Sequence, residues 1–222
     1  MNAPLVLHNL NQLSAHIPSG HRVLILTSPR RRHLDLIQEA LGEERVIMVF
    51  DQARVHVPRE VVDSALLICE ELKPHVILTL GGGAATGLGK ALLLRMSEAD
   101  SSEAKLGVNF MSIPTTYSGS EMTEIWGVTE MKSCAEGGHI RVKTTGRDPL
   151  VRPAVVVHDP RCLETLSPRL AVESLFNALA HPISALSVGL HDPQQSAAAL
   201  RAVSRAGAVG PPTVISVASR GQ

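Results

Sequence analysis

The sequence passes abruptly from an apolar run into three consecutive glycines, Gly81, Gly82 and Gly83, and then into a helix-forming segment that reaches Lys90. Glycine lets backbone N–H groups approach an anion with no Cβ in the way, and the N-terminus of the following helix adds the positive end of its dipole. The pattern predicts a strand, a phosphate-binding turn and a helix, in that order. A plain strand-to-helix turn has the same composition, so the glycines alone leave the ligand open.

Two known nucleotide-binding motifs do not fit this turn. A P-loop has a glycine where this chain has Ala84, and a Ser or Thr after the Gly-Lys pair, where it has Ala91. Since that hydroxyl is the group that binds Mg²⁺, we do not expect a nucleotide hydrolase. The dinucleotide fingerprint GxGxxG is absent as well, so any cofactor site at the turn must be of another type.

Apolar runs bounded by turn residues recur along the first part of the chain, as expected for strands buried on both faces of a parallel sheet. They cover residues 21–29, 45–51, 75–83 and 108–114. Helical spacing of apolar residues is found at 8–17, 34–42, 58–74 and from 84 to about 96. Strands that alternate with helices predict an α/β domain with a mainly parallel sheet, whose ligands bind at the carboxyl ends of the strands.

Polar side chains follow three of the predicted strands where each strand ends. Asp51 stands where dinucleotide-binding domains have an acid that binds the adenosine ribose hydroxyls and favours NAD over NADP, although exposed capping acids are also common there. Residues 115–121, TTYSGSE, are the densest set of hydroxyls in the chain. They predict a wall for a polar ligand, which an ordinary Ser/Thr turn would resemble. Residues 30–32, three arginines, fit either a solvated helix start or contacts to a cofactor phosphate.

Composition excludes several classes of partner. Lys plus Arg and Asp plus Glu balance at 21 each, so no net charge draws nucleic acid or an anionic membrane. Aromatic residues make up only 2% of the chain, too few for a nucleic-acid stacking platform. No stretch reaches the roughly 18 apolar residues of a membrane span, and the N-terminus lacks a secretory pattern. We therefore expect a small-molecule partner, and the three widely spaced cysteines favour a reducing cytoplasm.

Five stretches together resemble the iron-containing alcohol dehydrogenase superfamily, and within it the maleylacetate reductases. They are GGGAATGLGK (81–90), IPTTYSGSEMTEIWGVTE (113–130), KTTGRDPLVRP (143–153), VVVHDP (155–160) and SLFNALAH (174–181). The resemblance covers about residues 5–187. It implies a Rossmann-like nucleotide-binding domain over residues 1–160, followed by the start of an all-helical domain over residues 161–222, with the active site in the cleft between them.

The resemblance also implies a reaction and a set of cofactor contacts. The reaction is the reduction of the C=C bond of maleylacetate by NADH or NADPH, which gives 3-oxoadipate in the bacterial breakdown of aromatic compounds. The substrate is a dicarboxylate, and members of the family are often homodimers. The implied cofactor contacts are Asp51 at the adenosine ribose, Gly81, Gly82, Gly83 and Thr86 at the pyrophosphate, and Thr115, Thr116 and Ser118 along the nicotinamide ribose and adjoining phosphate.

Three further residues take catalytic or substrate-binding roles by the same resemblance. Lys143 would reach toward the cofactor or the substrate, and Arg147 would bind a substrate carboxylate, because a planar guanidinium pairs with carboxylates bidentately. His181 would lie in the substrate site or handle a proton. Without the resemblance, solvated surface positions for the two cations and an ordinary helix position for the histidine fit equally well.

Asn177 and His181 bear on the metal. They are spaced i and i+4, so they face the same side of a helix, as two ligands of a metal would. In the metal-dependent alcohol dehydrogenases, the first of this pair is an Asp that helps bind Fe²⁺ or Zn²⁺. An asparagine offers a neutral carbonyl, a much poorer ligand, so we expect no metal.

The chain departs from the family pattern at three places. Residues 131–141 are longer than the usual link, and Gly137 and Gly138 indicate an accommodating loop. Pro182 lacks the N–H that a helix interior needs, at a cost of roughly 3 kcal/mol, so we expect the helix to kink or end early. After about Gly189 the resemblance fades, which predicts an incomplete helical domain with a divergent tail from about residue 190.

Three hypotheses of function follow. The first is an NAD(P)H-dependent oxidoreductase of the maleylacetate reductase type. The second is a truncated or altered relative that keeps a nucleotide-binding half and has little or no catalysis. The third is a metal-dependent alcohol dehydrogenase.

Overall fold

The computed structural model describes residues 3–99, 107–134, 137–187 and 193–205 of the chain. The chain forms two compact units. The first, here called the sheet unit, comprises Met1–Thr115 and Ser120–Cys162, and the second, the helical unit, comprises Thr116–Gly119 and Leu163–Gln222.

A six-stranded parallel sheet forms the centre of the sheet unit, in the order β1-β8-β5-β4-β2-β3. Its strands are β1 (Leu5–Leu7), β2 (Val23–Thr27), β3 (Val46–Phe50), β4 (Val76–Gly81), β5 (Asn109–Pro114) and β8 (Val155–Val157). β2 and β8 are buried at every residue, which explains their unbroken apolar sequence. The predicted α/β class with a mainly parallel sheet is confirmed.

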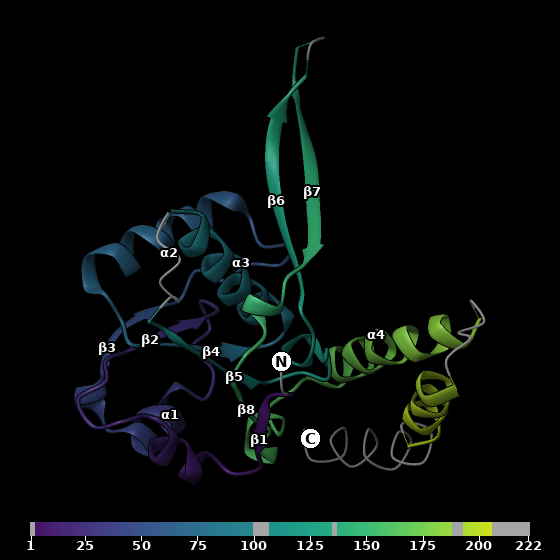
Figure 1. Cartoon of the computed structure of the whole chain (residues 1–222), viewed down its shortest axis with the longest axis horizontal. Helices are drawn as coiled ribbons and strands as arrows, with labels where there is room; N and C mark the ends of the chain where they lie inside the picture. The colour runs from purple at the N-terminus through teal and green to yellow at the C-terminus, as the bar shows by residue number, and fades with distance from the viewer. Residues whose placement is uncertain (1–2, 100–106, 135–136, 188–192, 206–222) are drawn as a thin grey trace. The chain divides into compact units, whose positions relative to one another are not determined.

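Helices cover both faces of this sheet. Figure 1 shows α1 (Leu34–Leu41) on one face and both α2 (Arg59–Leu72) and α3 (Gly83–Ala99) on the other. Short 3-10 helices complete the unit: η1 (Leu10–His16), η2 (Glu43–Arg45), η3 (Ser120–Met122), η4 (Pro149–Val151) and η5 (Pro160–Cys162). The predicted helix at residues 8–17 is thus of the 3-10 type.

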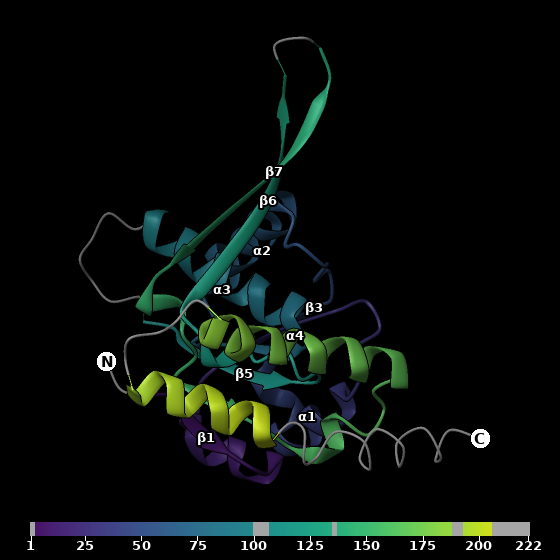
Figure 2. The ribbon, with the colours of Figure 1, turned by 90° about the vertical axis from the view of Figure 1, so that its right-hand side faces the viewer.

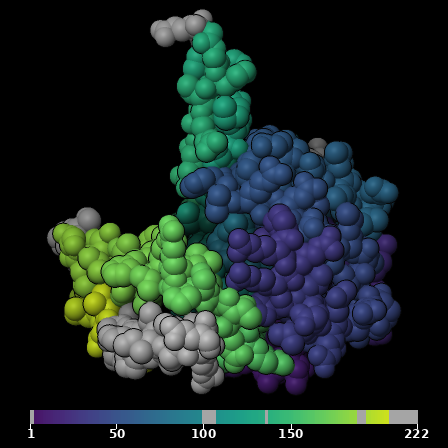
Figure 3. All heavy atoms as spheres, turned by 180° about the vertical axis from the view of Figure 1, so that it is seen from behind, coloured from purple at the N-terminus to yellow at the C-terminus, as the bar shows by residue number. Residues whose placement is uncertain are grey.

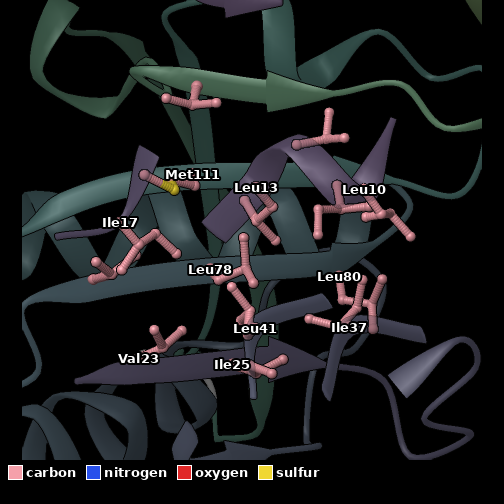
Figure 4. Packing of buried hydrophobic residues seen from close by; sticks show 14 of the residues in the cluster. Leu10, Leu13, Ile17, Val23, Ile25, Ile37, Leu41, Leu78, Leu80 and Met111 are labelled. Carbon is pink, nitrogen blue, oxygen red and sulfur yellow. The ribbon is translucent and has the colours of Figure 1, made fainter. Parts of the chain in front are cut away.

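Two hydrophobic clusters join the helices to the sheet. Because side chains alternate along a strand, Val23 and Ile25 of β2 face the cluster that includes η1 and α1, shown in Figure 4. Leu24 and Leu26 of the same strand face the cluster that includes α2 and α3. The core is built mainly of aliphatic side chains, as the low aromatic content requires.

The connections diverge at the centre of the sheet. β2 and β4 are neighbours, yet β2 is followed by β3 on one side and β4 by β5 on the other. The helices after β2 and β4 also lie on opposite faces (Figure 1). Such a topological switch point is where open α/β sheets bind ligands, outside the carboxyl ends of the strands. The glycine turn follows β4 at this point.

The sequence predicted a loop over residues 131–141, and the structure places most of that segment in a long antiparallel hairpin. β6 (Ile125–Ser133) pairs with β7 (His139–Arg147) along their whole lengths. Gly137 and Gly138, with φ of +80° and +132°, lie between the strands, where their left-handed backbone suits glycine. Figures 2 and 3 show the hairpin extending away from the helices of the sheet unit, so most of its side chains are exposed and leave no alternating apolar pattern.

The helical unit contains α4 (Pro168–Ser187), and residues 193–205 are also helical. α4 continues through Pro182, so the helix does not end there as one alternative held. Proline removes one hydrogen bond, and the helix formers on either side supply the others. The predicted divergent tail lies mostly outside the described residues. Within the described ranges, no helix is long and apolar enough to cross a membrane.

Asp159 ties the N-terminal segment to the end of β8. Its Oδ2 accepts hydrogen bonds from the Leu10 N–H at 2.8 Å and from the Arg161 guanidinium at 2.8 Å, and its Oδ1 accepts from the Arg161 N–H and Nε at 3.0 Å. These bonds, the one from the Arg161 side chain foremost, lower the pKa of the Asp159 carboxyl to about 2.

We expect Asp159→Asn to remove a pH-dependent part of the stability. A carboxyl whose pKa is lowered on folding stabilises the fold above its unfolded value near 4 and loses that contribution as pH falls through about 2. The variant should therefore be about 2 kcal/mol less stable at neutral pH, and the difference should shrink as pH falls and vanish only below pH ~2. Chemical denaturation across pH measures this difference, and a gap that stays constant with pH would contradict it.

The approach of α3 to the sheet depends on Gly89. A Cβ built at Gly89 would lie 2.6 Å from Thr79 Cγ2 and 2.7 Å from Phe110, whereas one at Gly107 would meet nothing within 4 Å. We expect Gly89→Ala to destabilise the protein by about 1–3 kcal/mol through overpacking, and Gly107→Ala to have little effect. Denaturant midpoints of the two variants check this, and equal midpoints would show that α3 does not need the glycine.

Candidate cofactor-binding site

The glycine turn joins β4 to α3 at the carboxyl edge of the sheet. Gly81 has φ +152°, and a Cβ there would lie 2.9 Å from that of Ala85, so a larger residue is both strained and crowded. The carbonyl of Gly82 accepts the N–H groups of Ala85 and Thr86 at 3.1 and 3.2 Å, and α3 begins at Gly83. The N–H groups of the first turn have no carbonyl within the helix to accept them, so they are available to an anion.

The hydroxyl of Thr86 lies inside the fold. Thr86 is buried, and its Oγ1 lies 3.4 Å from the Oγ of Ser112, which in turn accepts a hydrogen bond of 2.9 Å from Thr79 Oγ1. This hydroxyl cluster lies between α3 and the sheet. The role of Thr86 at the pyrophosphate stays a prediction, and the structure gives its hydroxyl a partner within the protein.

Thr115 begins the hydroxyl-rich segment within the sheet unit. It follows β5 directly, and its N–H donates to the carbonyl of Gly81 at 3.1 Å. Because β4 and β5 are neighbours, Gly81 pairs with Pro114 in the ladder. The start of the segment is therefore fastened to the glycine turn.

Thr116 and Ser118 belong to the helical unit. The Oγ1 of Thr116 accepts the N–H of Ser118 at 3.4 Å, and the N–H of Tyr117 donates to the Oγ of Ser174 on α4 at 3.3 Å. The Oγ of Ser118 is buried with no hydrogen-bond partner among the described residues. Since buried hydroxyls are almost always paired, this orphaned atom fits a ligand contact.

Asp51 follows β3 and forms an ion pair with Arg31, which follows the neighbouring strand β2. The Nε of Arg31 and a terminal guanidinium nitrogen both lie 2.8 Å from Asp51 Oδ2. The sequence alone did not predict that the arginine and the acid pair. The signal was present, because charges that follow adjacent parallel strands meet at the same edge.

Lys143 and Arg147 both lie on β7. Lys143 is exposed and opposite Thr129, whose N–H donates to the carbonyl of Val57 at 3.0 Å. Arg147 lies at the base of the hairpin with its side chain 71% exposed, 3.8 Å from Glu124. Arg152 lies closer to that carboxylate, at 3.1 Å. The two predicted cations are four residues apart on β7, so they lie on the same face of the hairpin, and their roles stay predictions.

Asn177 and His181 are both exposed on α4. An amide oxygen and one imidazole are a poor donor set for Fe²⁺ or Zn²⁺. In the part of the chain that the structure describes, no group of three or more His, Cys, Asp or Glu side chains could hold a metal ion. Asn177 and His181 therefore do not fit a metal site on their own.

Sequence reasoning missed a buried charge cluster beside the glycine turn. Lys90 on α3 has no exposed surface, and Glu121 on η3 is 4% exposed. The Oε1 of Glu121 lies 3.3 Å from Nε2 of His158, the residue after β8, and its Oε2 is without a partner among the described residues. A lysine inside the apolar stretch LGKALLL was the available signal.

The carboxyl edge therefore carries the groups that an extended dinucleotide requires. Asp51 and Arg31 lie after β3 and β2, the glycine turn after β4, and Thr115 after β5. In dinucleotide-binding sheets the pyrophosphate lies at a glycine turn and a helix N-terminus, and an acid one or two strands away binds the adenosine ribose. The residues fit NADH or NADPH in this arrangement.

Known proteins are similar to this chain in sequence and in fold. The family model for iron-containing alcohol dehydrogenase matches residues 6–160. Maleylacetate reductase 1 of Cupriavidus pinatubonensis is 40% identical over 169 residues, which is 75% of this chain and 42% of that protein. Maleylacetate reductase of Sphingobium indicum is 36% identical over 167 residues, with the same coverage of 75% and 42%. The chain thus spans less than half the length of the curated relatives it matches.

Solved structures of this family have a similar fold. The crystal structure of maleylacetate reductase from Agrobacterium tumefaciens matches with a TM-score of 0.72 and 32% identity, over 90% of this chain and 53% of that one. An iron-containing alcohol dehydrogenase from Thermococcus thioreducens matches with a TM-score of 0.80 over 96% of this chain and 60% of that one; at 22% identity it supports the fold alone.

Proposed function

The chain belongs to the iron-containing alcohol dehydrogenase family, and we propose that its activity is the NAD(P)H-dependent reduction of the C=C bond of maleylacetate to 3-oxoadipate. The observation that carries the proposal is the glycine turn at the switch point of a parallel sheet, with a helix N-terminus behind it. The relatives named maleylacetate reductase support the choice of substrate.

The sheet unit supplies the cofactor contacts in this proposal. Gly81 allows the backbone to approach a pyrophosphate, and the first turn of α3 donates N–H groups to it. Asp51 accepts hydrogen bonds from the adenosine ribose, and Thr115 and the unpartnered Ser118 bind the ribose and phosphate of the other half. When bound, the reduced nicotinamide would supply a hydride.

The substrate is a dicarboxylate, so it needs cationic partners. Arg147 has the longer of the two ion pairs to Glu124, at 3.8 Å against 3.1 Å for Arg152, which leaves its guanidinium able to bind a carboxylate. Lys143 on the same exposed strand adds a second positive charge. We assign His181, exposed on α4, to proton handling, because reduction of a C=C bond needs a proton beside the hydride.

We expect the purified protein to oxidise NADH when maleylacetate is added, at a rate that a metal chelator does not change. Gly81→Val should abolish NADH binding, because a side chain at φ +152° would be strained and would crowd Ala85 in the first turn of α3, which displaces the turn. Loss of NADH absorbance measures turnover, and NADH fluorescence measures binding.

The outcomes separate the alternatives. Turnover that is lost on chelation would favour a metal-dependent alcohol dehydrogenase. NADH binding without turnover would favour a nucleotide-binding protein without catalysis. If neither turnover nor binding is found, the assignment of the cofactor is wrong.

The ion pair between Arg31 and Asp51 governs the choice between NADH and NADPH in this proposal. Asp51→Ala removes the charge that repels a 2′-phosphate and leaves Arg31 beside it, so the NADPH:NADH preference should rise by about three- to tenfold. Arg31→Ala should shift the preference the other way. Asp35→Ala, an equal charge change at an exposed position of α1, is the control. Initial rates with both cofactors test this, and an unchanged preference in both variants would remove Asp51 from the ribose site.

We also propose the cytoplasm as the compartment. Cys69, Cys134 and Cys162 are free thiols, and burial raises the pKa of Cys69 to about 12 and that of Cys162 to about 11. Two of the three are therefore held as neutral core side chains, which is consistent with a reducing environment.

A further inference from the structure

Lys90 is fully buried on α3, two turns after the glycine turn. An ammonium removed from water costs a large free energy unless oxygen atoms replace the lost hydration. A lysine at this position therefore needs a specific set of acceptors, and the structure supplies them.

Four oxygen atoms surround the Nζ of Lys90. They are the carbonyl of Ser120 at 2.7 Å, the carbonyl and Oγ1 of Thr123 at 2.7 and 3.0 Å, and the carbonyl of Ile125 at 2.9 Å. An ammonium has three N–H donors, so each finds an acceptor. Three of these acceptors are backbone carbonyls, which makes Lys90 a clamp on the path of the chain from η3 into β6.

The clamped segment, residues 120–125, begins within the hydroxyl-rich segment 115–121. The N–H of Thr115 at one end of that segment donates to the carbonyl of Gly81, and Ser120 at its other end accepts from Lys90. Both anchors belong to the β4–α3 element that carries the glycine turn. The first residues of α3 therefore form part of the phosphate-binding turn, and its eighth residue, Lys90, holds the end of the hydroxyl-rich segment.

Glu121 compensates the buried charge. Its carboxylate raises the pKa of Lys90, while burial, the larger effect, lowers it to about 8, so the side chain carries its proton at neutral pH. The Oε1 of Glu121 faces His158 on the other side, at 3.3 Å.

Lys90 and the segment that it holds lie on one side of the proposed dinucleotide site. The adenosine side is marked by Asp51 and Arg31 after β3 and β2, and the pyrophosphate by the turn after β4. The other half of an extended cofactor must then pass the carboxyl end of β5, where residue 115 begins the segment that Lys90 fastens.

We propose that Lys90 is a positioning residue for the nicotinamide half of the cofactor, because its ammonium holds the segment from Ser120 to Ile125 in the place that half requires. The inference rests on the proposed cofactor site and adds to it a residue that does not touch the cofactor. It predicts that loss of the ammonium weakens contacts to one half of NADH and spares those to the other.

Lys90→Met keeps an unbranched side chain that is one atom shorter and removes the ammonium. Two ligands separate the halves of the site. NADH occupies the whole site, and ADP occupies only the adenosine and pyrophosphate part. We expect the dissociation constant of NADH to rise about tenfold or more in the variant and that of ADP to stay within about twofold of wild type. Lys132→Met, the same change at an exposed lysine paired with Glu130, should alter neither constant.

Thr123→Val provides a second test in case Lys90→Met does not fold. It removes only the Oγ1 acceptor and leaves the carbonyls in place, so we expect a rise of about two- to fivefold for NADH and none for ADP. Isothermal titration gives all the constants, and thermal melts establish that each variant is folded.

Each result is decisive. If the wild type binds neither ligand, the cofactor site itself is wrong. If the wild type binds both and the folded variants bind NADH as well as it does, Lys90 has no positioning role. If NADH and ADP affinities fall together, Lys90 supports the whole fold and the proposal is overturned; should Lys90→Met fail to fold, Thr123→Val alone decides.

Discussion

The close approach of α3 to the sheet is the constraint on which the rest of the site depends. A Cβ at Gly89 would overlap Thr79 and Phe110, and one at Gly81 would overlap Ala85, so the helix reaches this position only because both residues are glycine. Once α3 lies there, its N-terminus faces the carboxyl edge of the sheet, and Lys90 is carried into the interior within reach of η3 and β6. The packing of α3 against the sheet thus positions both the dipole of the helix and the buried charge of Lys90.

The parallel sheet could be predicted from the sequence because its physical signature is local. A strand buried on both faces needs an unbroken apolar run, as β2 and β4 show, and a turn at a switch point needs glycine. The hairpin of β6 and β7 leaves no such signature, because its exposed residues are free of any core pattern and only the glycines between the strands stand out. β1, with three residues, is too short for a periodicity to be recognised.

The candidate site likewise has features that the sequence could predict and features that it could not. Features that depend on the backbone, such as the glycine turn at Gly81, follow from the identity of single residues, so they could be predicted. Features that depend on which side chains meet in space were not. Arg31 and Asp51 are 20 positions apart, and Lys90 and Thr123 are 33 apart, so their pairing follows only from the order of the strands. Pro182 shows the converse, since a local rule suggested a helix end that the longer helix overrides.

The two walls of the proposed cofactor site therefore have different physical weaknesses. The phosphate side is made of N–H groups and a helix dipole, which remain as long as the helix is present and its glycines are kept. The opposite side is held by one ammonium among four oxygen atoms, with a carboxylate nearby that has one oxygen unpartnered among the described residues. Removing that ammonium leaves buried carbonyls and a buried carboxylate without compensation, which costs more than the hydrogen bonds contribute when they are intact. The geometry of the hydroxyl-rich side thus depends on a charge that makes no contact with the ligand, while the phosphate side depends on the absence of side chains.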